Sequence, residues 1–245
     1  RILRKLTVEV LNKKEDVIKN NNILGYLDTL NAKAKYAIEN DGVIANISNE
    51  RVLKLNNARH PLISKDKIVP NDFYLDDNQH LLIISGPNAG GKSVALKTIG
   101  LLVTMHQSGL PILASEGASI PMFKRIYVDI GDQQSLNDSL STFSAHMENI
   151  IDMSKKLGAK DLVIIDELGT GTDPSEGESL AKAILDYLHF KHAFGFISSH
   201  FMGVKTYALD KSYVMNASMI FDEINFMPTY KMRLGIPGKS YGMEV

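Results

Sequence analysis

A glycine-rich segment carries the strongest chemical signal in the sequence. It follows the apolar run 81–84, precedes a stretch of helical character over 92–104, and matches the pattern G-x-x-x-x-G-K-[ST]. Glycines allow backbone N–H groups to surround phosphate oxygens, and the N-terminus of a following helix adds positive potential. We therefore predict a phosphate-binding loop in which Lys92 reaches the β- and γ-phosphates of a nucleotide and Ser93 binds Mg²⁺. The expected binding set is Gly86, Pro87, Asn88, Ala89, Gly90, Gly91, Lys92, Ser93 and Val94.

Two adjacent carboxylates form the second signal. Asp166 and Glu167 directly follow the apolar run 162–165, which has the length and composition of a buried strand. In an open α/β sheet, ligands bind at the carboxyl ends of the strands. We expect Asp166 to bind Mg²⁺ and Glu167 to act as the general base that polarises the attacking water. Taken alone, the pair could instead be two acids that face solvent at a strand end.

Three weaker motifs could each have either a role in nucleotide binding or a purely structural role. The loop 169–174 could report nucleotide state or simply connect a strand to a helix, because Asp173 has the position of an N-cap before Pro174. His200 follows the apolar run 194–197 and could touch the γ-phosphate, although a histidine there is often structural. Ser141 begins an amphipathic segment, where a hydroxyl suits either an anion or ordinary helix capping.

The elements that must position these residues alternate between strand and helix. Residues 1–40 have helical spacing with interruptions at Asn20–Asn22 and Gly25, and Asp41-Gly42 predicts a turn. Short apolar runs then alternate with helical segments, and residues 213–232 have the alternation of a terminal hairpin. This order predicts an α/β fold with a mainly parallel central sheet covered on both faces, an antiparallel portion and an N-terminal helical appendage.

Composition excludes several classes of protein. The chain has 245 residues, a net charge of −1 and 44% hydrophobic residues, so it is neither a disordered chain nor a strongly basic nucleic-acid binder. It contains no cysteine, which excludes disulfides and thiol catalysis and is compatible with a reducing cytosol. Apolar runs are too short to span a membrane. Because the first residue is Arg1, we expect a fragment of a longer, cytoplasmic protein.

Taken together, the motifs resemble the ATPase domain of the MutS family. GPNAGGKS, then STF at a helix start, LVIIDELGTGTDP and SSHF occur in the family's order over about residues 52–245. NARHPLI (57–63) and KSYG (239–242) resemble its flanking motifs. The segments VPND (69–72), FSAHMENI (143–150), GTGTDPSEG (169–177) and GIPGKS (235–240) are closer to the type-two branch than to the mismatch-recognition branch.

The resemblance implies an ATPase of the ABC class that works as a homodimer with ATP and Mg²⁺. Each nucleotide would lie between Lys92, Ser93, Asp166, Glu167 and His200 of one subunit and Ser141 of the other, with Asp173 near the interface. Residues 1–45 would end the lever helices, and residues 46–245 would form the ATPase domain. DNA would be bound by domains outside this chain, as would any nuclease activity, and the type-two branch adds recombination control or ribosome rescue as functions.

Departures from the family pattern leave alternatives open. Where the mismatch-repair branch has an aromatic residue for adenine, this chain has the aliphatic stretch 67–70, in which Ile68 or Val69 could pack on the base. A mismatch-repair MutS, or another ABC-class ATPase such as an SMC-like repair protein, remains an alternative, although the LSGGQ-like signature of the latter is absent. A nucleotide-binding scaffold without turnover is disfavoured, because it has no need of both Asp166 and Glu167.

Overall fold

A computed structural model describes residues 2–131 and 139–236, with Asn88 and residues 139–142 described by their backbone alone. The chain divides into two compact units, residues 1–42 and residues 43–245. Among the described residues, no helix is long and apolar enough to cross a membrane.

The first unit consists of two helices, α1 (Ile2–Leu11) and α2 (Lys14–Asn40). The prediction that residues 20–22 and Gly25 interrupt this segment was wrong, because α2 continues through them. Exposed asparagines remain solvated in a helix, and one glycine costs only about 1 kcal/mol relative to alanine. The helix ends at Asp41, whose left-handed conformation (φ 50°) lets its N–H donate to the carbonyl of Ala37.

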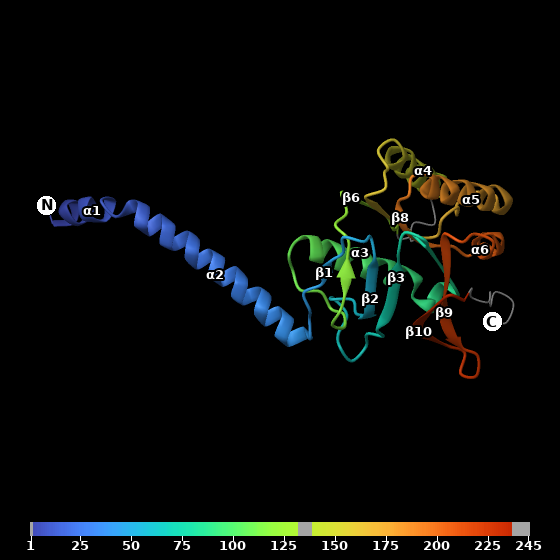
Figure 1. The fold of residues 1–245 in the computed structure, drawn as a ribbon, viewed down its shortest axis with the longest axis horizontal. Coiled ribbons are helices and arrows are strands. Elements are labelled where there is room, and N and C mark those ends of the chain that lie inside the picture. The colour runs from blue at the N-terminus through green and yellow to red at the C-terminus, as the bar shows by residue number, and fades with distance from the viewer. Residues whose placement is uncertain (1, 132–138, 237–245) are drawn as a thin grey trace. The chain divides into compact units, whose positions relative to one another are not determined.

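The centre of the second unit is a six-stranded mixed sheet (Figure 1). Its strands lie in the order β10-β9-β4-β8-β7-β6, and only β10 is antiparallel to its neighbour. The predicted terminal hairpin is β9 and β10. The strands are β4 (Leu81–Ser85), β6 (Arg125–Asp129), β7 (Asp161–Ile165), β8 (Phe194–Ser198), β9 (Val214–Asp222) and β10 (Met227–Leu234).

A smaller sheet and four α-helices complete this unit. The small sheet has the order β1-β5-β2-β3, and β2 pairs with β3 in the antiparallel sense. Its strands are β1 (Asn46–Ile47), β2 (Leu53–Ala58), β3 (Asn71–Leu75) and β5 (Ser119–Ile120). The helices are α3 (Lys92–Gln107), α4 (Ser139–Ser154), α5 (Pro174–Phe190) and α6 (Met202–Leu209), with a short 3₁₀ turn, η1, at Asn88–Gly90.

Alternate residues of the central strands face two different cores. Leu82 and Ile84 of β4 pack with α3 and the small sheet, whereas Leu81 and Ile83 pack with α5 and α6. Figure 1 shows α4, α5 and α6 together, apart from α3. The central sheet is thus covered on both faces, and the fold is α/β as the apolar runs predict.

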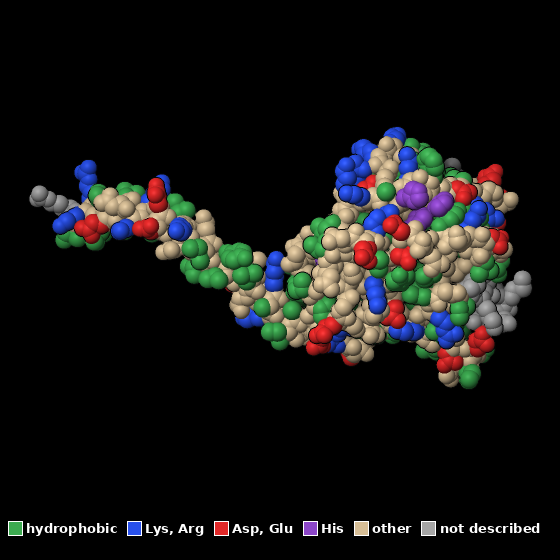
Figure 2. All heavy atoms as spheres, viewed as in Figure 1, with side chains coloured by type: hydrophobic (Ala, Val, Ile, Leu, Met, Phe, Trp, Pro, Cys, Tyr) green, Lys and Arg blue, Asp and Glu red, His purple; other side chains and the backbone are tan. Residues whose placement is uncertain are grey.

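Histidines that are distant in sequence gather on the surface of this unit (Figure 2). His80 and His189 stack with centroids 5.1 Å apart, and His192 lies 5.8 Å from each of them. Their sequence spacing does not predict this contact. Within the described part of the chain, no group of three or more His, Asp or Glu residues is arranged to hold a metal ion.

Candidate functional site

The glycine-rich segment forms a tight loop between β4 and α3. Gly86 and Gly91 adopt φ angles of 137° and 95°, which side-chain-bearing residues rarely adopt. A Cβ atom at Gly86 would also lie 3.0 Å from the Cβ of Met219 on β9. Between them, η1 closes with the Gly90 N–H donating to the Pro87 carbonyl at 3.0 Å. The glycines are therefore required by the loop geometry itself.

Lys92 is the buried cation of this loop. Its side chain is 2% exposed, and its Nζ donates to the carbonyl oxygen of Gly86 at 2.8 Å. Burial lowers the pKa of Lys92, while the carboxylates of Glu167 and Asp166 oppose that shift. The ammonium group is thus held beneath the loop and faces the acid pair. Such a cation can neutralise phosphate charge.

The acid pair lies where β7 ends. Asp166 is buried, and its backbone N–H donates to the carbonyl of Asp129 on β6 at 2.9 Å. Glu167 has a left-handed backbone (φ 51°), an arrangement that costs about 1–3 kcal/mol for a non-glycine residue. Its N–H donates to the Ser198 hydroxyl at 2.7 Å. Neighbouring strands therefore hold both acids at the carboxyl edge of the sheet.

His200 follows the end of β8 at the same edge. Its ring lies 4.4 Å from that of Phe201, measured between centroids. Partial loss of water around the ring lowers the pKa of His200, and the carboxylate of Glu167 opposes the shift. Lys92, Glu167 and His200 are thus close enough to influence one another electrostatically. They come from β4–α3, β7 and β8, which are consecutive strands in the sheet.

The remaining predicted residues have different surroundings. Ser93 and Val94 occupy the first turn of α3, where Ser93 is half-buried and Val94 is 41% exposed. Ala89 is exposed in η1. The Asp173 carboxylate accepts the N–H groups of Ser175 and Glu176 at 2.9 and 3.4 Å, which confirms the predicted N-cap of α5.

Several predicted features fall outside the described residues. The side chains of Asn88 and Ser141 are among them, and so are residues 239–242 and most of 235–240. The structure places the backbone of Ser141 within the first turn of α4. Its contact with a nucleotide stays a prediction.

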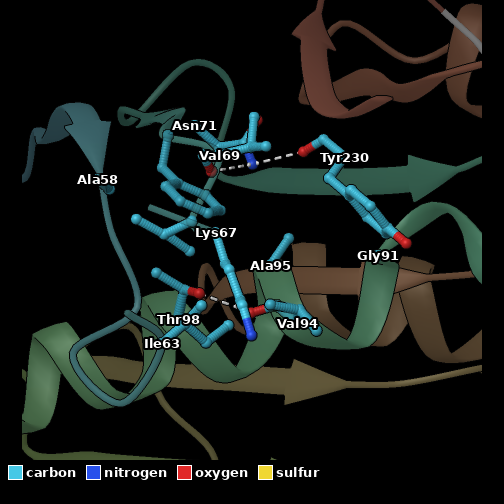
Figure 3. A pocket seen from close by; sticks show the side chains of 12 residues that line it. Ala58, Ile63, Lys67, Val69, Asn71, Gly91, Val94, Ala95, Thr98 and Tyr230 are labelled. Carbon is cyan, nitrogen blue, oxygen red and sulfur yellow. Dashed lines mark hydrogen bonds between the residues drawn. The ribbon is translucent and has the colours of Figure 1, made fainter. Parts of the chain in front are cut away.

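A cavity of about 170 Å³ adjoins the phosphate loop (Figure 3). Apolar side chains from three segments line it, including Ile63, Ile68, Val69 and Val94. Tyr230 of β10 lies at its margin, beside Gly91. A Cβ atom at Gly91 would lie 3.1 Å from the Tyr230 ring. The cavity is therefore a mainly apolar space beside the loop, with Lys67, Asn71 and Thr98 as polar residues in its lining.

Sequence reasoning missed Tyr230 because no local pattern marks it. The tyrosine sits in a β-bulge between Pro228 and Met232, with φ 56°. Asn71 of β3 holds this bulge with both ends of its amide. Its Nδ2 donates to the Tyr230 carbonyl at 3.0 Å, and its Oδ1 accepts the Met232 N–H at 2.6 Å. Asn71 is the first residue of β3 and is buried, but the sequence does not indicate that its amide contacts β10.

The donor set suits Mg²⁺. Magnesium binds oxygen ligands and usually takes one or two protein groups beside phosphates and water. A carboxylate at Asp166 and a hydroxyl at Ser93 provide such oxygens at the same sheet edge, and no soft ligand lies among the predicted site residues. The residues present therefore fit this cation.

The fold and site define an α/β domain with a phosphate loop and an acid pair at the carboxyl ends of parallel strands. Residues 82–245 match the family model of MutS domain V, the ATPase domain of these proteins. The chain belongs to the MutS family.

Curated relatives agree with this assignment over the whole chain. Endonuclease MutS2 of Finegoldia magna and of Fusobacterium nucleatum are each 44% identical to it over 245 residues, and that of Clostridioides difficile is 45% identical. Each alignment covers 100% of this chain but only 31–32% of the relative. The chain thus spans about a third of the length of these proteins. The resemblance to the type-two branch is therefore confirmed.

Proposed function

We propose that this chain binds ATP with Mg²⁺ and hydrolyses it between the phosphate loop and the acid pair. The observation that carries the proposal is the convergence of Lys92, Glu167 and His200 from three adjacent parallel strands at one sheet edge. Ligands bind at that edge in α/β sheets. The family's ATPase domain agrees with this chemistry.

Each side chain has a distinct task in this reaction. Lys92 exchanges the Gly86 carbonyl for the β- and γ-phosphates, and backbone N–H groups of the loop, which Pro87 lacks, donate to phosphate oxygens. Glu167 orients and deprotonates the attacking water, while His200 donates toward the γ-phosphate. Mg²⁺ held by Ser93 and Asp166 would neutralise charge that develops on the phosphates.

The apolar cavity receives the adenine base. Ile68 and Val69 cover one face of the base, and the Tyr230 ring stacks against it. The Tyr230 ring thus provides the aromatic contact with the base that the aliphatic stretch 67–70 lacks. This arrangement supports binding of a purine nucleotide.

We further propose that the domain works as an ABC-type homodimer. Ser141 of one subunit then contacts the γ-phosphate bound by the other, and the loop near Asp173 lies at the interface. Residues 1–45 belong to the lever that connects residues 46–245 to DNA-binding domains elsewhere in a cytoplasmic protein. The relatives' name, Endonuclease MutS2, supports action on nucleic acid. Branched DNA or stalled ribosomes are the targets that we propose.

ATP hydrolysis by the full-length protein tests the proposal. The rate per subunit is measured with Mg²⁺ over a range of protein concentrations, for wild type, Glu167→Gln and Glu116→Gln. Glu116 is a matched control, because it is exposed in the turn before β5 and outside the acid pair. Loss of a general base lowers turnover by about 100-fold or more.

We expect Glu167→Gln to retain ATP and lose turnover, while Glu116→Gln hydrolyses ATP like wild type. The wild-type rate per subunit should rise with protein concentration if the site is composite. Equal rates for wild type and Glu167→Gln would refute the catalytic assignment. A concentration-independent rate would refute the dimeric sandwich alone.

A further inference from the structure

Ser198 links the two acids of the site to each other. It is the last residue of β8, and its side chain is fully buried. Its hydroxyl donates to Asp166 Oδ1 and accepts the backbone N–H of Glu167 at 2.7 Å. A hydroxyl has one proton, so accepting from Glu167 leaves that proton for the carboxylate. We propose that Ser198 is a positioning residue that sets the geometry of Asp166 and Glu167 for ATP hydrolysis, an inference that rests on the proposed function.

The backbone around Glu167 shows why such a residue is needed. The pairing of β7 with β8 runs to Ile165 and Ile197, after which the chain turns away from the sheet. Glu167 makes this turn with a left-handed φ of 51°. A strained conformation of this kind persists only where its surroundings determine it. The turn therefore sets the direction of the Glu167 side chain. Hydrogen bonds to the backbone of the turn hold it in this conformation.

Ser198 provides two consecutive hydrogen bonds to that turn. Its side chain accepts the Glu167 N–H, and its backbone carbonyl accepts the Leu168 N–H at 3.0 Å. The backbone carbonyl would remain in any variant, whereas the side-chain bond is lost when the hydroxyl is removed. Removal of the hydroxyl therefore frees Glu167 while the sheet stays paired.

The same hydroxyl orients the buried carboxylate. Asp166 Oδ1 accepts the Ser198 O–H, and Oδ2 accepts no hydrogen bond from the described residues. The bond to Ser198 fixes the carboxylate plane and leaves Oδ2 for a cation. Partners that orient a metal-binding carboxylate typically change metal affinity or activity by about 10- to 100-fold when they are removed.

The neighbouring Ser199 provides a matched control. It is equally buried on the same chain segment, but its hydroxyl accepts the backbone N–H of Phe201 at 3.3 Å. Loss of either hydroxyl removes one buried oxygen of the same size. Only the loss at Ser198 breaks the connection between the two acids.

The experiment compares Ser198→Ala, Ser198→Thr and Ser199→Ala in the full-length protein. ATP turnover is measured across Mg²⁺ concentrations, and binding of a fluorescent ATP analogue is titrated with and without Mg²⁺. Thermal melting without nucleotide reports folding. We expect Ser198→Ala to lower kcat by about 10- to 100-fold, to raise the Mg²⁺ concentration for half-maximal rate, and to leave the KM for ATP within about threefold. Analogue binding without Mg²⁺ should match wild type, while its enhancement by Mg²⁺ should shrink.

Rescue separates positioning from packing. Ser198→Thr keeps the hydroxyl and should restore the Mg²⁺ response, and Ser199→Ala should resemble wild type. Wild-type turnover and Mg²⁺ response in Ser198→Ala would overturn the inference, as would equal losses in Ser198→Ala and Ser199→Ala. If wild type itself neither bound nor hydrolysed ATP, the proposed function would fail and this inference with it. An active wild type with an unaffected Ser198→Ala refutes the positioning role alone.

Discussion

Gly177, in the first turn of α5, lies against the loop that follows the acid pair. An ideal Cβ at Gly177 would lie 2.2 Å from the carbonyl oxygen of Gly169 and 3.2 Å from the Phe201 ring. Gly169 itself has φ 89°, and a Cβ there would lie 2.4 Å from the Gly177 carbonyl. Helix and loop thus meet backbone to backbone. We predict that Gly177→Ala displaces the loop and lowers both stability and ATP turnover.

Two opposing effects decide the magnitude. Alanine is favoured over glycine inside a helix by about 1 kcal/mol. Against this, the new methyl group would be more than 1 Å inside the 3.4–4 Å range of ordinary contact, and the opposing atom is backbone. Overpacking of this kind costs about 3 kcal/mol at the upper end of its usual range. The net loss is therefore about 2 kcal/mol, or about 4–8 °C in Tm for a domain of this size.

Denaturant titration followed by circular dichroism measures this loss, together with ATP turnover in the same preparation. Gly25→Ala is the matched control, because Gly25 is also helical and a Cβ there has nothing within 4 Å. We expect Gly25→Ala to increase the helicity of α2 and to leave turnover unchanged. A Gly177→Ala protein as stable and active as wild type would refute the reasoning.

Three further predictions concern the base, the histidines and a helix cap. Tyr230→Ala should weaken fluorescent-nucleotide binding by about 5- to 150-fold, since base stacking contributes about 1–3 kcal/mol. Tyr230→Phe keeps the ring and should weaken binding by less than about threefold. Equal affinities of Tyr230→Ala and wild type would contradict stacking. Burial lowers the pKa of His80 and His189 below 6.5, so the unfolded state binds more protons. Urea titrations should therefore show stability falling as pH drops below 6.5, with a shallower slope in His80→Gln. Asp173→Ala should cost about 1 kcal/mol in the same titrations and Asp173→Asn much less, because Asn also caps helices.

Much of the fold was predictable because its signals are local. The apolar runs 81–84, 162–165 and 194–197 are too short for buried helices, and they form β4, β7 and β8. The break predicted in α2 failed because asparagine and glycine weaken a helix without ending it. The small sheet was harder to predict, since β5 inserts between β1 and β2 from a distant part of the chain.

The residues of the candidate site also fall into two groups, those that local sequence indicates and those that depend on distant contacts. The phosphate loop and the acid pair are contiguous in sequence, so glycine geometry and strand ends indicate them directly. Tyr230 depends on a bulge held by Asn71, 159 residues away, which no local pattern contains. The hydroxyl of Ser198 meets Asp166 only because β7 and β8 pair in one particular register. Sequence patterns indicate the chemistry, whereas register and bulges determine its geometry.

Strand β8 lies between β4 and β7 in the sheet, although it follows both of them along the chain. During synthesis, the phosphate loop and the acid pair therefore emerge before the strand that aligns them. The inner edges of β4 and β7 stay unpaired until residues 194–198 are available. A nascent chain that ends before β8 has the phosphate loop and the acid pair but no strand to join them. Insertion of this one five-residue strand brings the two together at one sheet edge, and His200 and Tyr230 follow it along the chain.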